Sequence, residues 1–370
     1  MQQWNLDLQR QLPAGFFADV AYAASKGAHL PGPTDLQINQ IPDRFIAQAA
    51  QQAAAGTPIT ILNPVPYPFS GIGPGTGLSP GSKIIQGQLD RPFPEYTGVS
   101  LAGYGCCDSN YQSLQVSVQR RFQGGGTMLV AYTNSKLISN TDTLTTWLED
   151  SGVGQVQDWN NLRGERSVSS QDVSQRLVIS YVLDLPFGHG KKFLSGASGV
   201  AGKAVSGWGV DGVTSFQRGF PVKITWGGAN TALQNAGLGI GNLRPNVVSG
   251  CSKTTSGSAK SRLGGTFGGP GWINAACFSD PPAWGFGSEP RVDPNLRAQG
   301  VNNFDFAVFK RTTFGPDERV GLELRTEFFN LFNHPQFGPP NGSFGSSTFG
   351  QVTSQEGNPR LIQFALKFVF

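Results

Sequence analysis

Short segments in which apolar and polar residues alternate dominate this chain, a pattern typical of strands whose two faces meet different surroundings. The pattern is clearest at the C-terminal end, where the sequence closes on PRLIQFALKFVF. The apolar positions there are Ile362, Phe364, Leu366, Phe368 and Phe370. The residues between them are mixed in character, so this strand needs lipid or a protein core on one side and water on the other.

Strands of this kind come in pairs that short turns join. One pair is VSVQRRFQGGGTMLVAYTNSK, and another is NNFDFAVFKRTTFGPDERVGLELRTEFFNLF, which turns at FGPDE. In the second pair, one face is apolar and the other carries Asp305, Glu323, Arg325 and Glu327. These charges could suggest the paired carboxylates of a hydrolase. Their period of two, with an arginine among them, instead predicts lumen-facing charges that satisfy one another.

An internal repeat supports a serial hairpin architecture. Residues 8–26 align without a gap on residues 118–136. The identical pairs are Gln9/Gln119, Arg10/Arg120, Gly15/Gly125, Val20/Val130, Ala21/Ala131, Tyr22/Tyr132, Ser25/Ser135 and Lys26/Lys136. The sequence therefore uses one strand–turn–strand unit twice, which does not favour a helix-bearing enzyme domain.

The lengths of the connections alternate between short and long. PAG, QGGG and FGPDE are short, whereas residues 27–110, 138–172, 226–301 and 333–357 form long stretches rich in Gly, Pro, Asn and Ser. Short periplasmic turns and long extracellular loops are the layout of an outer-membrane β-barrel. The one long link on the side of the short turns is PFGHGKKFLSGASGVAGKA. We therefore predict an all-β, antiparallel transmembrane barrel.

The predicted strand count is about nine, within a range of nine to twelve, and it begins with a strand that runs inward. Bacterial single-chain barrels have even strand numbers. Either IPDRFIAQ or PITILNPV is a further strand, or the chain is the end of a larger barrel. The opening MQQWNLDLQR has no secretory leader. We favour the second alternative, in which residues 1–370 are the C-terminal portion of a barrel without its signal peptide and plug domain.

Composition agrees with a membrane barrel. Only 14% of the residues are charged, well below the usual share of about a quarter. No run approaches the ~18 apolar residues of a transmembrane helix. The net charge of +4 gives no case for nucleic acid as a partner.

The cysteines and histidines give no sign of a metal site or a cofactor. Adjacent Cys106 and Cys107 are too close for an unstrained bond. Cys251 and Cys277 flank a Gly/Ser/Thr-rich stretch, and they are either free thiols or a loop disulfide formed in an oxidising compartment. The predicted topology places His189 on the opposite side of the membrane from the other two histidines.

Two further stretches could suggest enzymatic or phosphate-binding chemistry. GIGPGTGLSPGSK lacks the adjacent Gly-Lys of a phosphate-binding loop, and the basic FGHGKK follows a strand and reads as a turn. We therefore expect no enzymatic activity.

The sequence resembles the C-terminal part of TonB-dependent outer-membrane receptors of the Oar-like group, which carry a carboxypeptidase-regulatory-like domain. The segments that carry the resemblance are YQSLQVSVQRRFQGGGTMLVAYTNSK, SQRLVISYVLDLPFGHGKKF, GWGVDGVTSFQRGFPV, GVNNFDFAVFKRTTFG, LRTEFFNLFNHPQFGPPN and STFGQVTSQEGNPRLIQFALKFVF. The resemblance implies a place in the outer membrane of a Gram-negative bacterium, in contact with its lipid. It also implies that the barrel-insertion machinery reads the terminal strand, with Phe364, Leu366, Phe368 and Phe370 in that role.

The function implied by the resemblance is uptake of an extracellular ligand, such as an oligosaccharide, a peptide or a metal chelate. Coupling to the TonB complex would act through the plug that this chain does not include. Two alternatives are a structural or adhesion barrel without transport, and a soluble β-sandwich that binds carbohydrate. A sandwich would direct the alternating apolar faces inward. The sequence does not choose among the ligands and does not fix the oligomeric state.

Overall fold

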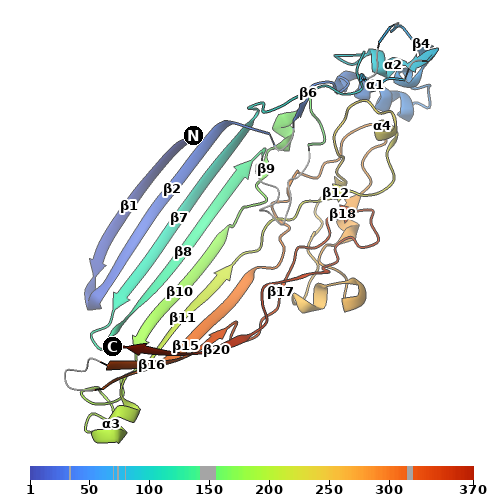
Figure 1. Cartoon of the computed structure of the whole chain (residues 1–370). Coiled ribbons are helices and arrows are strands. Elements are labelled where there is room, and N and C mark those ends of the chain that lie inside the picture. The colour runs from blue at the N-terminus through green and yellow to red at the C-terminus, as the bar shows by residue number, and fades with distance from the viewer. Residues whose placement is uncertain (33–34, 70, 73–74, 80, 142–155, 315–319) are drawn as a thin grey trace.

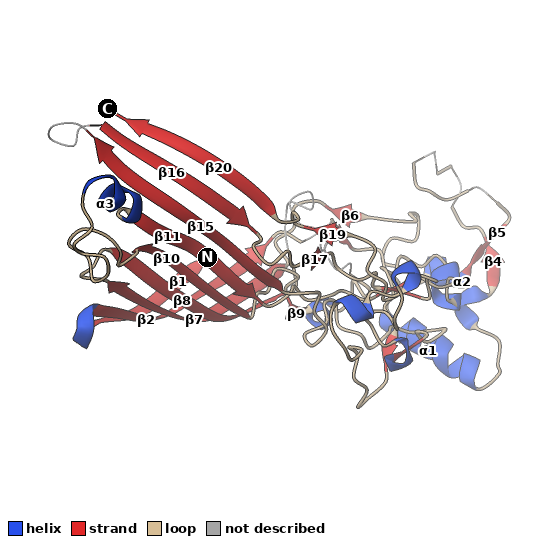
Figure 2. Cartoon of the chain, turned by 90° about the horizontal axis from the view of Figure 1, so that it is seen from below, coloured by secondary structure: helices blue, strands red, loops and turns tan. Residues whose placement is uncertain are grey.

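The computed structural model describes residues 1–370 except 33–34, 70, 73–74, 80, 142–155 and 315–319. One large antiparallel sheet dominates it (Figures 1 and 2). Its long strands, in spatial order, are β1 (Gln2–Leu12), β2 (Phe16–Leu30), β7 (Cys107–Arg121), β8 (Gly126–Ser139), β10 (Gln175–Asp184), β11 (Trp208–Gln217), β15 (Val301–Phe314), β16 (Val320–Phe329) and β20 (Leu361–Val369). The short strand β9 (Ser167–Val168) pairs with the end of β8. The prediction of about nine serial strands is confirmed.

The sequence repeat is a repeat of structure. Gln2 pairs with Lys26 in the first hairpin, and Gln112 pairs with Lys136 in the second. The register is thus the same in both hairpins, relative to the aligned sequences. Short turns close both, at the 3-10 turn Pro13–Gly15 and at residues 122–125. The FGPDE turn falls mostly at 315–319, outside the described residues.

The register places the predicted apolar positions on one face of the sheet. Phe306 pairs with Phe328, and Phe328 pairs with Ile362 on the other side. This face is open to the surroundings, since Phe364 is 74% exposed. The opposite face carries glutamine, asparagine, serine and charged side chains. An apolar face turned outward and a polar face turned inward is the pattern of a membrane barrel. A sandwich needs a second packed sheet, so that alternative is wrong.

The two edge strands leave the sheet open. β1 and β20 lie at opposite ends of the strand order and do not pair with each other. Because the nine long strands alternate in direction, β1 and β20 run the same way. A direct β1–β20 pair would therefore be parallel, unlike every other pair of long strands in the sheet.

The long connections gather at one end of the sheet (Figure 1). We call the described parts of residues 31–106, 140–174, 218–300 and 330–360 the loop assembly. Its helices are α1 (Asp43–Ala54), α2 (Gln86–Leu89) and α4 (Ala232–Asn235), with 3-10 turns at Thr60–Leu62, Leu162–Glu165, Lys260–Arg262, Gly265–Phe267 and Ala275–Cys277. Its two-stranded pairs are β3 (Leu36–Gln37) with β6 (Ser100–Leu101), β4 (Pro64–Pro66) with β5 (Lys83–Ile85), β12 (Thr225–Trp226) with β18 (Ser343–Phe344), β13 (Asn246–Val247) with β14 (Phe278–Ser279), and β17 (Gln336–Phe337) with β19 (Gln355–Glu356).

Neither candidate for an additional barrel strand belongs to the sheet. IPDRFIAQ lies mainly in helix α1, because its run of alanine and glutamine favours a helix and Ile46 and Ala49 supply a buried helical face. PITILNPV forms a 3-10 turn and the short strand β4. Among the described residues, no helix is long and apolar enough to cross a membrane.

The hydrophobic core of the molecule lies in the loop assembly rather than in the sheet. One cluster consists of Val222, Ile224, Leu263, Trp272, Ile273, Cys277, Phe278, Leu296 and Val352. A second consists of Ile41, Ile46, Ala49, Ile61, Leu233, Leu238 and Trp284. The segments that composition identifies only as loops therefore bury their own apolar side chains. The strands, in contrast, leave the apolar side chains of their lipid-facing side exposed.

A disulfide joins Cys251 and Cys277 beside the first cluster, and their Cα atoms lie 5.4 Å apart. Cys106 and Cys107 are free thiols. No group of three or more histidine, cysteine or acidic side chains that could hold a metal occurs within the described ranges.

A candidate ligand cleft at the mouth of the sheet

The polar face of the sheet ends in a cleft of about 620 Å³ next to the loop assembly. Its floor comes from the last polar-face positions of four strands: Gln217, Val301, Asn303, Asp305, Phe329 and Leu361. Its rim comes from the loops and carries Phe220, Gln299, Gln336, Phe337, Glu356 and Asn358. We call this the mouth cleft. Its lining combines amides, two carboxylates and exposed phenyl rings.

The carboxylate of Asp305 is fixed at the bottom of the mouth cleft. It accepts a hydrogen bond from the backbone N–H of Asn330 at 2.9 Å and another from the side-chain amide of Asn303 at 2.9 Å. Asn330 follows β16 directly and has a left-handed backbone with φ 51°. Its side chain donates to the carbonyls of His334 and Asn358. The end of β16 is thus tied to the start of β20, which sets the shape of the floor.

The rim is held by hydrogen bonds between the loops. The Gln299 side chain accepts from the backbone of Phe337 at 2.7 Å and donates to the carbonyl of Pro335 at 3.1 Å. Phe220 forms part of the wall, and its carbonyl accepts a hydrogen bond from the backbone N–H of Ala298 at 2.9 Å. These bonds hold the Gln299 side chain and the backbone at Phe220 in place, so the rim has a defined shape.

Below the mouth cleft, the polar face carries a ladder of charges. The two terminal guanidinium nitrogens of Arg325 contact the carboxylate of Asp211 at 2.6 and 2.7 Å, and its Nε contacts Glu327 at 2.6 Å. Two residues further along β16, Glu323 contacts Arg311 of the adjacent strand β15 at 2.8 Å. Phe309 is almost fully buried beneath the two arginines.

The four charges that the sequence singles out therefore lie on one face, but they do not form a single group. Arg325 and Glu327 meet directly, whereas Glu323 pairs with Arg311 and Asp305 lines the mouth cleft. Asp211 and Arg311 are not among the charges that the sequence predicted for this face. Asp211 alternates with the apolar residues Trp208 and Val210 in GWGVDGV, so it belongs to the polar face. This alternation could have identified it.

The predicted terminal-strand residues lie together on the apolar face. Ile362, Phe364, Leu366 and Phe368 occupy alternate positions of β20, and Phe370 follows the strand. His29 lies near the end of β2 and His334 in the loop after β16, both at the loop end of the sheet, whereas His189 lies in the link between β10 and β11 at the opposite end. The structure does not bring the three histidines together.

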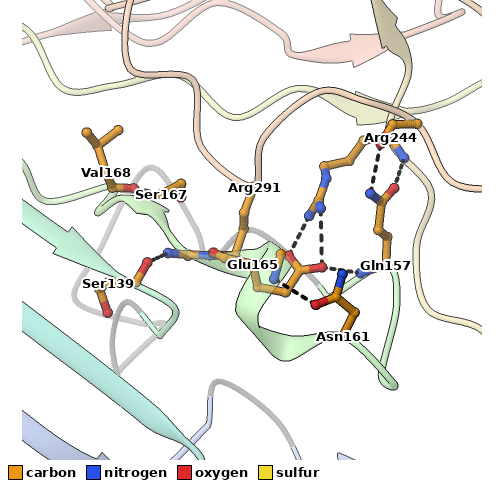
Figure 3. A network of polar contacts seen from close by, with 10 residues as sticks. Ser139, Gln157, Asn161, Glu165, Ser167, Val168, Arg244 and Arg291 are labelled. Atoms are coloured by element: carbon orange, nitrogen blue, oxygen red, sulfur yellow. Dashed lines mark hydrogen bonds and ion pairs between the residues drawn. The ribbon is translucent and has the colours of Figure 1, made fainter.

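A buried polar network holds the loop assembly to the sheet (Figure 3). The carboxylate of Glu165 accepts two hydrogen bonds from Arg244, at 2.7 and 3.2 Å, and one from the backbone of Gln157 at 3.1 Å. Arg291 donates to the carbonyl of Glu165 at 3.0 Å and to that of Ser139 at 2.7 Å. Ser139 is the last residue of β8, so this network connects strand and loops.

A second buried ionic cluster supports the wall of the mouth cleft. The ammonium of Lys253 contacts Glu289 at 2.8 Å and Asp293 at 2.5 Å, and both carboxylates are almost fully buried. The backbone N–H of Asp293 donates to the carbonyl of Val222, two residues from Phe220. Burial and the neighbouring Asp293 raise the pKa of Glu289 to about 8. Hydrogen bonds from Lys253 and Glu289 outweigh burial at Asp293 and lower its pKa.

This cluster gives the loop assembly a pH dependence. Between the ordinary glutamate pKa of 4.5 and about 8, folded Glu289 holds a proton that the unfolded chain releases. The free energy of unfolding contributed by Glu289 therefore falls as pH rises through this window. Denaturant titrations followed by tryptophan fluorescence, to which buried Trp272 and Trp284 contribute, are expected to show this fall, and Glu289→Gln is expected to reduce it.

The control for the pH experiment is Asp280→Asn, which changes an exposed carboxylate in the same assembly. This variant is expected to keep the wild-type slope between pH 5 and pH 8.5. An unchanged slope in Glu289→Gln would show that the buried cluster does not titrate in this range.

Comparison with known proteins identifies the family of this chain and a solved structure that is similar to it. A family model described as an outer membrane beta barrel domain matches residues 1–363. No curated protein matches the sequence. Among solved structures, the chain is similar to the outer membrane transporter YddB from Escherichia coli, with 6% identity and a TM-score of 0.44. That match covers 99% of this chain and 32% of the transporter, so the chain spans about a third of its length.

Proposed function

Because this chain belongs to the outer membrane beta barrel domain family, we propose that it is the ligand-binding barrel portion of a TonB-dependent receptor of the Oar-like group. Family membership places the protein in the outer membrane of a Gram-negative bacterium. The proposed activity is uptake of an extracellular ligand such as an oligosaccharide, a peptide or a metal chelate. The chain has no enzymatic role in this proposal.

The mouth cleft is the observation that carries the proposal. It lies on the polar face, at the end of the sheet where the long loops gather, which is the extracellular end in a barrel of this class. Its volume of about 620 Å³ is within the usual range for small-ligand sites. Phenyl rings supply apolar contact, while amides and carboxylates can bind hydroxyl, amide or ammonium groups.

Transport also needs a route below the site, and the ladder of charges on the polar face offers one. Asp211, Arg325 and Glu327 line the face directly below the mouth cleft. In the proposed receptor, further strands close the open edges at β1 and β20. A plug then fills the lumen and transmits the energy of the TonB complex.

The test begins with binding by the detergent-solubilised chain. Three fluorescent probes represent the ligand classes: a neutral maltoheptaose, a pentapeptide and a ferric catecholate. We expect one of them to bind. The double variant Gln217→Ala/Asn303→Ala is expected to weaken that binding about 10- to 100-fold, because each lost hydrogen bond costs about 0.5–1.5 kcal/mol.

The matched control changes two exposed side chains of helix α1, as Gln48→Ala/Gln51→Ala, and is expected to keep wild-type affinity. In cells that carry the complete receptor, uptake of the probe that binds should stop when TonB is deleted. Binding without TonB-dependent uptake would instead support a structural or adhesion barrel. The packed, disulfide-linked loop assembly suits that second function equally well.

A further inference from the structure

The link between β10 and β11 has an unusual surface for a periplasmic connection. Residues 185–207 contain three lysines and a histidine but no aspartate or glutamate. Several apolar side chains of the link are exposed: Phe187, Phe193, Leu194 and Val200, the last at 88%. Helix α3 (Gly199–Val205) projects from the short-turn end of the sheet (Figures 1 and 2). Basic and apolar groups together on one surface are typical of segments that bind anionic membranes.

The link is clamped to the lipid-facing side of the sheet. The ammonium of Lys310 donates to the carbonyls of Lys203 and Ser206, both at 2.7 Å, and lies 5.2 Å from the ring of Trp208. Trp208 and Lys310 are register partners on the apolar face. The Trp208 indole N–H donates to the carbonyl of Ala204 at 2.9 Å. Helix α3 therefore sits at the short-turn end of the apolar face, against Trp208 and Lys310.

A cleft of about 460 Å³ lies between this link and the end of β15. Its polar lining includes His189, Lys203, Arg311, Ser206 and Thr312. Within the described residues, no carboxylate lines it. Arg311 pairs with Glu323, but Lys203 directs its ammonium to the carbonyl of Thr313 and to the ring of Phe314, 4.9 Å away. Cationic and hydroxyl groups without an acidic neighbour in the lining suit a phosphate ester.

We propose that this cleft and its link bind an anionic phospholipid of the periplasmic leaflet. The headgroup phosphate lies in the cleft near Lys203, and the acyl chains follow the apolar face past Phe314 and Trp208. Lys192 approaches neighbouring headgroups. Lys191 lies 3.8 Å from the carboxylate of Asp184 and donates to the carbonyl of Gly124 at 2.8 Å, so it adds less positive charge at the same surface. The chemistry distinguishes anionic from zwitterionic lipids through the excess of positive charge, and it distinguishes lipid from free phosphate through the adjoining apolar face.

Native mass spectrometry of the detergent-solubilised full chain tests the proposal, with phosphatidylglycerol and phosphatidylcholine as probes. We expect phosphatidylglycerol to bind at least about tenfold more tightly. The triple variant Lys191→Gln/Lys192→Gln/Lys203→Gln should lose this preference, and the corresponding triple change to arginine should retain it. The control Lys83→Gln/Lys260→Gln/Arg166→Gln removes equal charge from the loop assembly and should retain the preference.

Three results would overturn the proposal. They are a preference that persists in the triple glutamine variant, a preference lost equally in the control, and displacement of phosphatidylglycerol by inorganic phosphate at comparable concentration. The circular dichroism spectrum of each variant verifies that the sheet is folded, so a misfolded variant is not counted as a loss of binding. The inference requires only the membrane location and is independent of any transported ligand.

Discussion

Replacing Arg291 with methionine is expected to unfold the loop assembly at a markedly lower denaturant concentration while the sheet remains folded. Arg291 is 1% exposed. Its loss leaves the carbonyls of Glu165 and Ser139 without the hydrogen bonds it now donates. A buried polar group left unpaired costs about 1–3 kcal/mol, so the two together predict a loss of about 2–6 kcal/mol.

The effect of Arg291→Met should be measured by two probes in parallel. Tryptophan fluorescence, to which Trp272 and Trp284 of the two hydrophobic clusters contribute, reports on the loop assembly, and circular dichroism reports on the sheet. Arg166→Met, which changes an exposed arginine next to Glu165, is the matched control. Equal fluorescence midpoints in the two variants would contradict the role assigned to the network in Figure 3.

Replacing Leu366 with arginine is expected to prevent stable insertion of the terminal strand. Leu366 lies near the middle of β20 on the apolar face, where it pairs with Leu324 and is 60% exposed. An arginine on the lipid face near the bilayer midplane costs about 2–4 kcal/mol. Gln363→Arg is the control, because Gln363 lies on the polar face opposite Glu327, where a cation is favourable.

Folding into phosphatidylcholine vesicles measures this difference. The wild type and Gln363→Arg should give the same protease-protected fraction, and Leu366→Arg should give much less. Comparable insertion of both variants would mean that the two faces of β20 do not meet lipid and lumen as described.

The strands were predictable because their physical signal is local. Alternation of apolar and polar residues fixes which side chain faces lipid, as with Phe364 and Leu366, and short turns fix which strands are neighbours. The repeated hairpin added independent support, and its two copies have one register. Because the number of serial strands is odd, β1 and β20 run the same way and could meet only as a parallel pair.

The loop assembly was not predictable in the same way. Composition identifies its segments as loops, but it does not reveal that α1 packs Ile46 against residues more than a hundred positions away. The ionic partners are also distant in sequence: 79 positions separate Glu165 from Arg244, and 152 separate Ser139 from Arg291. No local pattern encodes such pairs. The mouth cleft depends on the same long-range contacts.

The most direct test of the account is labelling of single cysteines on intact cells with a membrane-impermeant maleimide. Ser256→Cys lies in an exposed part of the loop assembly, and Ser195→Cys lies in the exposed link at the other end of the sheet. Cys106→Ser/Cys107→Ser is the background, so that no other free thiol reacts. The account predicts labelling of Ser256→Cys on intact cells and of Ser195→Cys only after the outer membrane is permeabilised. Labelling of Ser195→Cys alone on intact cells, or of both equally, would contradict it.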